Sequence, residues 1–165
     1  MPARALVLYP DPRLSLPAAP VETFGPDLAA LAEDVRDTLI AVSALGLTAC
    51  HLGILRRVVV ARLRPEDAPK VYVNPEIVAA SPETAAHDEG SVSMPGVRET
   101  ILRPARVTLR YADLGGAPHE ETAEGFAAAI LQHEIDQLDG IFWIDRLSRL
   151  KRDRLRKRFS KIGTA

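Results

Sequence analysis

Hydrophobic residues recur at three- and four-residue steps in two long segments, the spacing of an amphipathic α-helix. The first segment opens at Gly25 and Pro26, and its apolar positions are Leu28, Leu31, Ala32, Val35, Leu39 and Val42. The second runs from about Glu120 to Leu138 and stops at Gly140, a residue type that often ends helices. Gly125 inside this helix makes the helix about 1 kcal/mol less stable than alanine would. We therefore expect that a close packing partner opposite Gly125 requires the glycine.

Shorter β-branched or alternating runs occupy the middle of the chain. Residues 55–63 contain three consecutive valines, and Val71–Val73 precedes an Asn-Pro pair, which predicts two short strands, each followed by a turn. Arg106–Tyr111 alternates polar and apolar side chains, as in a strand with one solvated face. The order of elements predicts one α+β domain, residues 1–165, in which the second helix packs against antiparallel sheet.

Composition limits the classes of protein that the chain can form. It has 165 residues, 47% hydrophobic and 26% charged, which suits one globular domain with a core. No apolar run is long enough to cross a bilayer, and the amino end lacks the apolar centre of a secretion signal, so we expect a cytoplasmic protein. The single cysteine, Cys50, excludes an internal disulfide framework and a four-cysteine zinc module.

Basic side chains are concentrated near the C-terminal end. Residues 146–165 carry nine basic and one acidic side chain, whereas residues 1–145 carry 12 basic and 21 acidic ones. The pattern predicts a basic helix at about 148–161 with a narrow apolar edge, made of Leu147, Leu150, Leu155 and Phe159. Its charged face either is only solvated or binds phosphate, and phosphate binding would weaken steeply with salt.

The segment QHEIDQLDG, residues 132–140, has the most informative chemistry. Two histidines four residues apart on a helix can bind one metal ion, with a glutamate beside them to move the proton of the bound water. Here His133 and Glu134 are present, but Gln137 occupies the second histidine position. The segment is therefore either an incomplete metal-binding helix or a helix whose His133 and Glu134 only hydrogen-bond their neighbours.

Two other segments are less informative when each is considered alone. Residues 89–97, EGSVSMPGV, favour a loop. Residues 44–54, ALGLTACHLGI, contain Gly46, which permits a close backbone approach, and the adjacent pair Cys50 and His51. A lone cysteine among apolar residues is more often a small buried side chain than a reactive group.

In this order and spacing, the three segments resemble the peptide deformylase family, metalloenzymes that remove the formyl group from the initiator methionine of new bacterial polypeptides. The family pattern is GΦGΦAAxQ, then EGCΦS, then HExDH. Other stretches are also similar, including YPDPRL at 9–14 and VNPEI at 74–78, so the resemblance covers about residues 5–160. It implies an α+β fold with antiparallel sheets around a central helix that carries the HExx(Q) residues.

The resemblance also implies a cofactor and partners. Family members use a divalent metal ion, which is iron, zinc or nickel, and act on N-terminal formyl-methionyl peptides at the ribosome. We therefore expect this chain to bind methionyl or formyl-methionyl peptide ends. Its basic C-terminal helix is a candidate ribosome contact, and no membrane partner is expected.

The matching positions imply roles for individual residues. The family's three metal ligands correspond to Ser91, His133 and Gln137, so only one of the three ligand types is retained. Glu134 matches the general acid/base, while His51 replaces the glutamine that, with the backbone amide of Val92, holds the oxyanion. Four further positions match the residues with which the family binds its substrate, including the methionine side chain: Gly46, Leu45, Phe126 and Ile130.

These substitutions predict weak or absent hydrolysis and a site that need not hold a metal ion. A serine hydroxyl ionises far less readily than a thiol, and a neutral amide is a poorer ligand than imidazole for zinc, iron or nickel. Three alternatives are open: a rebuilt metal site that uses His51 and His133, a nucleophile and base formed by Ser91 and His133 with Glu134 orienting the histidine, and a non-catalytic binder of methionyl peptide ends.

Overall fold

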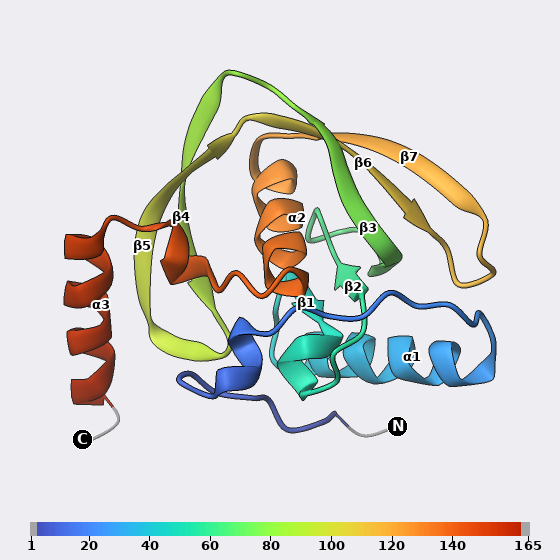
Figure 1. Ribbon diagram of the computed structural model, residues 1–165, viewed down its shortest axis with the longest axis horizontal. Helices are drawn as coiled ribbons and strands as arrows, with labels where there is room; N and C mark the ends of the chain where they lie inside the picture. Colours follow the sequence, from blue (N-terminus) through green and yellow to red (C-terminus); the bar gives the residue numbers. More distant parts are fainter. Residues whose placement is uncertain (1–2, 163–165) are drawn as a thin grey trace.

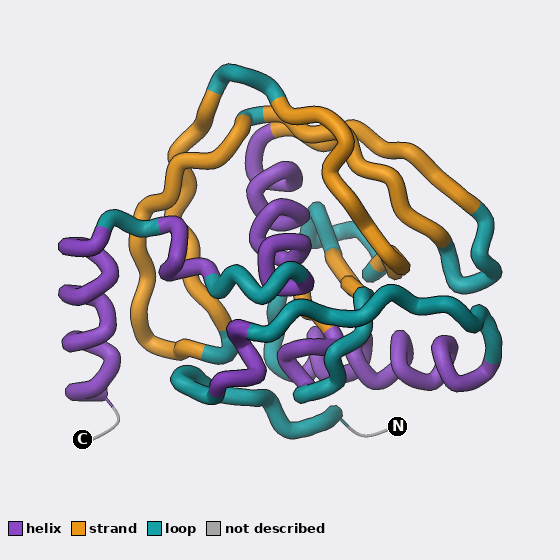
Figure 2. Tube along the Cα trace, viewed as in Figure 1, coloured by secondary structure: helices purple, strands orange, loops and turns teal. Residues whose placement is uncertain are grey.

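The computed structural model describes residues 3–162, in which two antiparallel sheets lie around a central helix, α2 (Figures 1 and 2). The ends of the predicted 1–165 domain, residues 1–2 and 163–165, lie outside this part. The helices are α1 (Pro26–Ala41), α2 (Gly125–Leu138) and α3 (Arg149–Ile162), with short 3-10 helices η1 (Pro12–Ser15), η2 (Ala49–Leu52) and η3 (Trp143–Arg146). The strands are β1 (Gly46–Thr48), β2 (Val58–Ala61), β3 (Lys70–Ala80), β4 (Thr84–Ser91), β5 (Met94–Pro104), β6 (Arg106–Ala112) and β7 (Pro118–Glu124).

The larger sheet has the strand order β1-β2-β3-β6-β7, and β4 and β5 form a separate hairpin. Apolar side chains of α2 pack against the larger sheet in one buried cluster that includes Leu131 and Leu138 of the helix and Val59, Tyr72 and Leu109 of the strands. The predicted α+β class, with antiparallel sheets around this helix, is confirmed. No helix within residues 3–162 is both long and apolar enough to cross a membrane.

The second predicted helix begins later than expected. Residues 118–124 form β7, which pairs with β6, and the helix starts only at Gly125. Gly125 has φ of +60°, a left-handed backbone conformation that glycine adopts easily. Nothing lies within 4 Å of where its Cβ would be, so the predicted close packing partner is wrong. The glycine is suited to the change of direction from strand to helix.

Two predicted connections are also wrong. The Asn-Pro pair after Val73 does not end a strand, since β3 continues to Ala80 across a register shift. Asn74, at φ of +50°, bonds through its side-chain amide to both the backbone N–H and C=O of Val21, which supports this irregularity. Residues 89–97 are largely strand, because Ser91 pairs with Met94 in the β4–β5 hairpin.

The basic C-terminal helix is present as α3 and lies beside β5 (Figure 1). Leu155 and Phe159 are four residues apart and share one face of the helix. Leu155 is fully buried, and the ring of Phe159 meets the ring of Tyr9 edge-on at 5.9 Å. Leu155 and Phe159 attach α3 to the body and leave most of its basic side chains exposed. Of the other residues predicted for the apolar edge, Leu150 is exposed, so that part of the prediction is wrong, and Leu147 is buried but precedes the helix.

The packing of α3 predicts the effect of truncating two leucines of the same helix. Leu155→Ala removes a fully buried side chain and should lower the free energy of unfolding by about 2–5 kcal/mol in urea titrations. Leu150→Ala is the matched control, because Leu150 is 61% exposed, and it should change that free energy by about 0.5 kcal/mol or less. Equal effects of the two substitutions would contradict the packing described.

Candidate functional site

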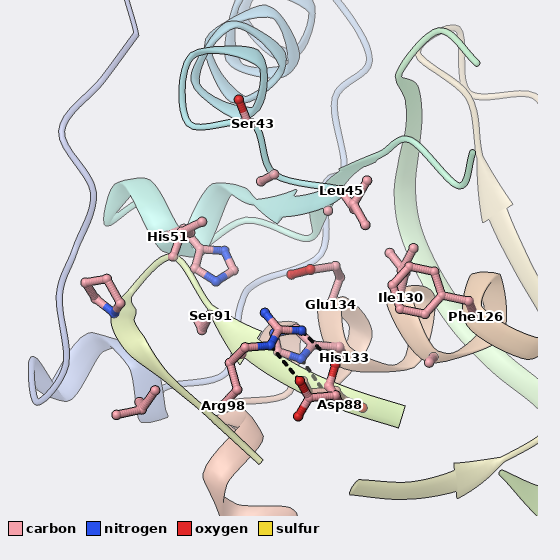
Figure 3. Close-up of a pocket in the computed structure, with 18 of the residues that line it drawn as sticks. Ser43, Leu45, His51, Asp88, Ser91, Arg98, Phe126, Ile130, His133 and Glu134 are labelled. Carbon is pink, nitrogen blue, oxygen red and sulfur yellow. Dashed lines mark hydrogen bonds and ion pairs between the residues drawn. The ribbon is translucent and has the colours of Figure 1, made fainter. Parts of the chain in front are cut away.

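A cavity of about 590 Å³ lies between α2, the β4–β5 hairpin and the segment from Ser43 to His51 (Figure 3). It therefore joins the three segments that the sequence singled out. Nine of the ten predicted site residues line it, and the tenth, Gln137, does not. The nine are Leu45, Gly46, His51, Ser91, Val92, Phe126, Ile130, His133 and Glu134.

His133 is held by a buried carboxylate. Its Nδ1 lies 2.9 Å from Oε1 of Glu89, which also accepts two hydrogen bonds from Arg103. Burial alone would raise the pKa of Glu89, but the hydrogen bonds from His133 and Arg103 outweigh it and lower this pKa to about 2. Since Glu89 is ionised, Nδ1 carries the hydrogen of this bond, and Nε2 is the nitrogen left to face other groups.

The ion pairs continue beyond Glu89. Arg103 also bonds Asp136 at 2.9 Å, and Asp136 receives two further bonds from Arg146 of η3. This chain of charges joins the hairpin, α2 and η3. Glu89, Arg103 and Asp136 were not predicted as a group, because they are far apart in the sequence and no local pattern shows that the side chain of Arg103 is buried.

Glu134 is the most isolated polar group of the cavity. It is 4% exposed, and its Oε1 has no hydrogen-bond partner among residues 3–162. Burial raises the pKa of its carboxyl group, while the neighbouring His133 opposes this shift. A Cβ on Gly46 would lie 2.6 Å from Glu134 Oε2, so only glycine lets the backbone pass this close to the carboxyl group.

His51 presents a hydrogen-bond donor to the cavity. The backbone N–H of Thr48 donates to His51 Nδ1 at 3.0 Å, and a backbone amide can only donate. Burial lowers the pKa of His51 to about 3, and the nearby His133 adds to this effect, so the ring is neutral at pH 7. A neutral ring whose Nδ1 accepts carries its hydrogen on Nε2. Figure 3 shows this ring beside the cavity with Glu134 and Ser91.

The side chains at the family's three metal-ligand positions do not fit a resident transition-metal ion. Gln137 donates its amide to the carbonyl oxygen of Leu14 at 2.8 Å, and the hydroxyl of Ser91 accepts the amide N–H of Ser93. Only His133 offers a strong donor. No group of three His, Cys, Asp or Glu side chains within the described residues is placed to hold a metal ion.

Cys50 provides no replacement ligand. It is fully buried, as predicted for a small apolar side chain, and is not among the residues that line the cavity. Burial raises the pKa of its thiol to about 11, so little thiolate forms at neutral pH.

One side of the cavity is apolar. Leu45, Phe126 and Ile130 lie together there (Figure 3), with Ile130 buried and Phe126 half exposed beside the ring of His87. The opposite side carries His51, Ser91, His133 and Glu134. The cavity thus offers an apolar contact surface next to a group of hydrogen-bonding side chains, the usual composition of a small-molecule or peptide-end site.

The lowered pKa of Glu89 predicts how stability depends on pH. Its ionised form stabilises the folded protein above the pKa of an unfolded glutamate, about 4.3, and this contribution is lost as the pH falls toward 2. Glu89→Gln should lower the free energy of unfolding by about 3–5 kcal/mol near pH 7, because it breaks a buried ion pair. The deficit should shrink as urea titrations move from about pH 5 to about pH 3.

Glu124→Gln is the matched control for this measurement. Glu124 pairs with Arg106 at 2.9 Å, but both side chains are exposed. Loss of this exposed ion pair should lower the free energy of unfolding by about 1 kcal/mol or less at any pH. A deficit for Glu89→Gln that stays constant with pH would contradict the assigned ionisation.

Comparison with known proteins places this geometry in a family. Residues 3–153 match the family described as Polypeptide deformylase. A Brucella suis protein named "Peptide deformylase-like" is 54% identical over 98% of this chain and 99% of its own length, and a Nitrobacter hamburgensis "Peptide deformylase" is 39% identical over 99% and 97%. The crystal structure of peptide deformylase from Ehrlichia chaffeensis in complex with actinonin has a TM-score of 0.93 and 34% identity and covers all of both chains. The chain therefore belongs to the polypeptide deformylase family.

Proposed function

We propose that this chain binds peptide ends that begin with methionine or formyl-methionine and hydrolyses the N-formyl amide weakly or not at all. One observation carries the proposal: of the three positions that the family uses for its metal, only His133 keeps a strong donor. Gln137 bonds a backbone carbonyl outside the cavity, and Ser91 offers a neutral hydroxyl. Deformylases depend on a metal ion for hydrolysis, so a donor set this poor predicts impaired turnover.

The apolar and hydrogen-bonding residues of the cavity support the proposal that the chain binds peptide ends. Leu45, Phe126 and Ile130 supply an apolar surface for a methionine side chain. His51 Nε2–H, together with the backbone amide of Val92, offers hydrogen bonds to a formyl or peptide carbonyl oxygen. Glu134 is placed to exchange a proton with a bound amide or water. These groups recognise a peptide end without requiring that its bond be cleaved.

The alternative of an active enzyme with a rebuilt metal site requires a lone pair from His51. Its Nδ1 lone pair is already used by the Thr48 amide, and its Nε2 carries a hydrogen. Metal ligation by His51 would therefore break a buried hydrogen bond and change the tautomer. The free-energy cost of breaking this hydrogen bond disfavours a rebuilt metal site and supports impaired hydrolysis.

The test measures metal content, formate release and peptide binding on one freshly purified sample. We expect well under one metal ion per chain by elemental analysis and little formate from a formyl-methionyl peptide. We also expect calorimetric heat of binding from that peptide, reduced when its methionine is replaced by glycine. Near-stoichiometric metal with clear turnover would overturn the proposal of impaired hydrolysis, and absence of binding would overturn the proposal of a binder.

A pair of double variants tests whether the ligand substitutions cause the defect. Ser91→Cys with Gln137→His restores the family's donors, and metal content and formate release should both rise. Ser93→Cys with Gln137→His is the matched control, because Ser93 is buried outside the cavity lining, so its thiol should not join the site.

We also propose that the basic face of α3 contacts ribosomal RNA. Arg154 and Lys157 are exposed on this helix, and the family acts on new chains at the ribosome. Sedimentation with ribosomes should be clear at about 50 mM salt and fall steeply by about 200 mM. Arg154→Ala with Lys157→Ala should weaken binding, whereas Arg106→Ala with Arg110→Ala, the same charge change on β6, should not. Salt-insensitive binding, or none at low salt, would refute this contact.

A further inference from the structure

Ser91, His133 and Glu89 lie in the order of a nucleophile, a base and an orienting carboxylate. Glu89 and Ser91, at the end of β4, both line the cavity, although the β4–β5 pairing shifts register between them. His133 on α2 lines the same cavity and bonds Glu89 through Nδ1 at 2.9 Å. We propose that these three residues form a metal-free acyl-transfer site, an activity distinct from deformylation.

The orientation of the base supports this assignment. Because Nδ1 of His133 bonds Glu89, Nε2 is the ring nitrogen left to exchange a proton with a hydroxyl group. Glu89 is itself held by two bonds from buried Arg103. The orienting residue is therefore Glu89, and not Glu134 as the sequence suggested. Glu134 forms no such bond to the ring within the described residues.

The nucleophile is held by its own hairpin. Ser91 Oγ accepts the backbone N–H of Ser93 at 3.1 Å, which leaves the hydroxyl hydrogen free to be donated. Ser91 and His133 line the same cavity (Figure 3) without a direct hydrogen bond in the part of the chain described. In unliganded sites this bond is often long and shortens when substrate binds.

The remaining groups of the cavity suit the acyl part of a substrate. His51 Nε2–H is a neutral donor on the polar side, where the oxygen of a tetrahedral intermediate would develop its charge. Leu45, Phe126 and Ile130 give the acyl chain an apolar surface. The substrate class that fits is an ester or thioester of a short apolar acyl group.

The reaction balances without a co-reactant other than water. Ser91 Oγ forms a bond to the acyl carbon while its proton moves to His133 Nε2. The bond to the alcohol or thiol then breaks, and the leaving group takes that proton. Water, deprotonated by His133, next attacks the acyl carbon. The bond to Ser91 Oγ then breaks, and His133 returns the proton to Oγ, which releases the carboxylic acid and restores the serine hydroxyl.

A fluorophosphonate probe tests the nucleophile in buffer that contains a metal chelator. Attack by an activated serine forms an O–P bond, breaks the P–F bond and releases fluoride, so the adduct can be located by peptide mass spectrometry. We expect one adduct at Ser91, absent in Ser91→Ala and unchanged in Ser93→Ala, whose hydroxyl is buried outside the cavity lining. His133→Asn should slow labelling by about 100-fold or more while urea unfolding verifies that the variant is folded.

Several results would overturn this proposal: no adduct on folded protein, an adduct that persists in Ser91→Ala, or labelling that requires added metal. Hydrolysis of p-nitrophenyl butyrate provides a second measurement and should depend on Ser91 in the same way. The proposal rests on the cavity and not on peptide recognition. Calorimetry with the formyl-methionyl peptide on the same preparation therefore separates its failure from failure of the proposed binding function.

Discussion

The chain of charged side chains from His133 through buried Glu89, Arg103 and Asp136 to the partly exposed Arg146 is the constraint on which the rest of the site depends. Burying any one of these charged side chains alone would lower the free energy of unfolding. Their hydrogen-bonded partners offset that cost. The chain connects the β4–β5 hairpin, the central helix and η3. It therefore holds the walls of the cavity in place through bonds that do not pass through a metal ion.

This separation explains how the fold tolerates changes at the family's ligand positions. Ser91 and Gln137 are not members of the chain of charges, so their identity can change without leaving a buried charge unpaired. Gln137 has instead become structural, since its amide bonds Leu14 and links α2 to η1. A TM-score of 0.93 to a family enzyme is consistent with a scaffold stabilised independently of the residues at those two positions.

The sequence predicted the parts of this protein that depend on local pattern. Helix α1, strand β6 and helix α3 follow from apolar periodicity. The family resemblance predicted nine residues of the cavity, seven of them in the three motif segments and the other two, Phe126 and Ile130, earlier in α2. The errors at residues 120–124 and at Asn74 arise where pairing with a distant strand, or a bond to Val21, overrides local preference. The charge chain through Arg103 was not predicted for a similar reason, because only tertiary packing shows that an arginine on a strand is buried.

The two histidines of the cavity show why residue type alone does not define a metal site. His51 accepts at Nδ1 from a backbone amide and so carries its hydrogen on Nε2, whereas His133 bonds a carboxylate through Nδ1. At Nδ1, one ring therefore accepts a hydrogen bond and the other donates one. In the family motif a glutamine amide occupies the position of His51, and an imidazole N–H can make the same kind of hydrogen bond. His51 can therefore donate a hydrogen bond as the glutamine amide does, but it has no free lone pair to offer a metal ion, because its Nδ1 accepts from Thr48 and its Nε2 carries a hydrogen.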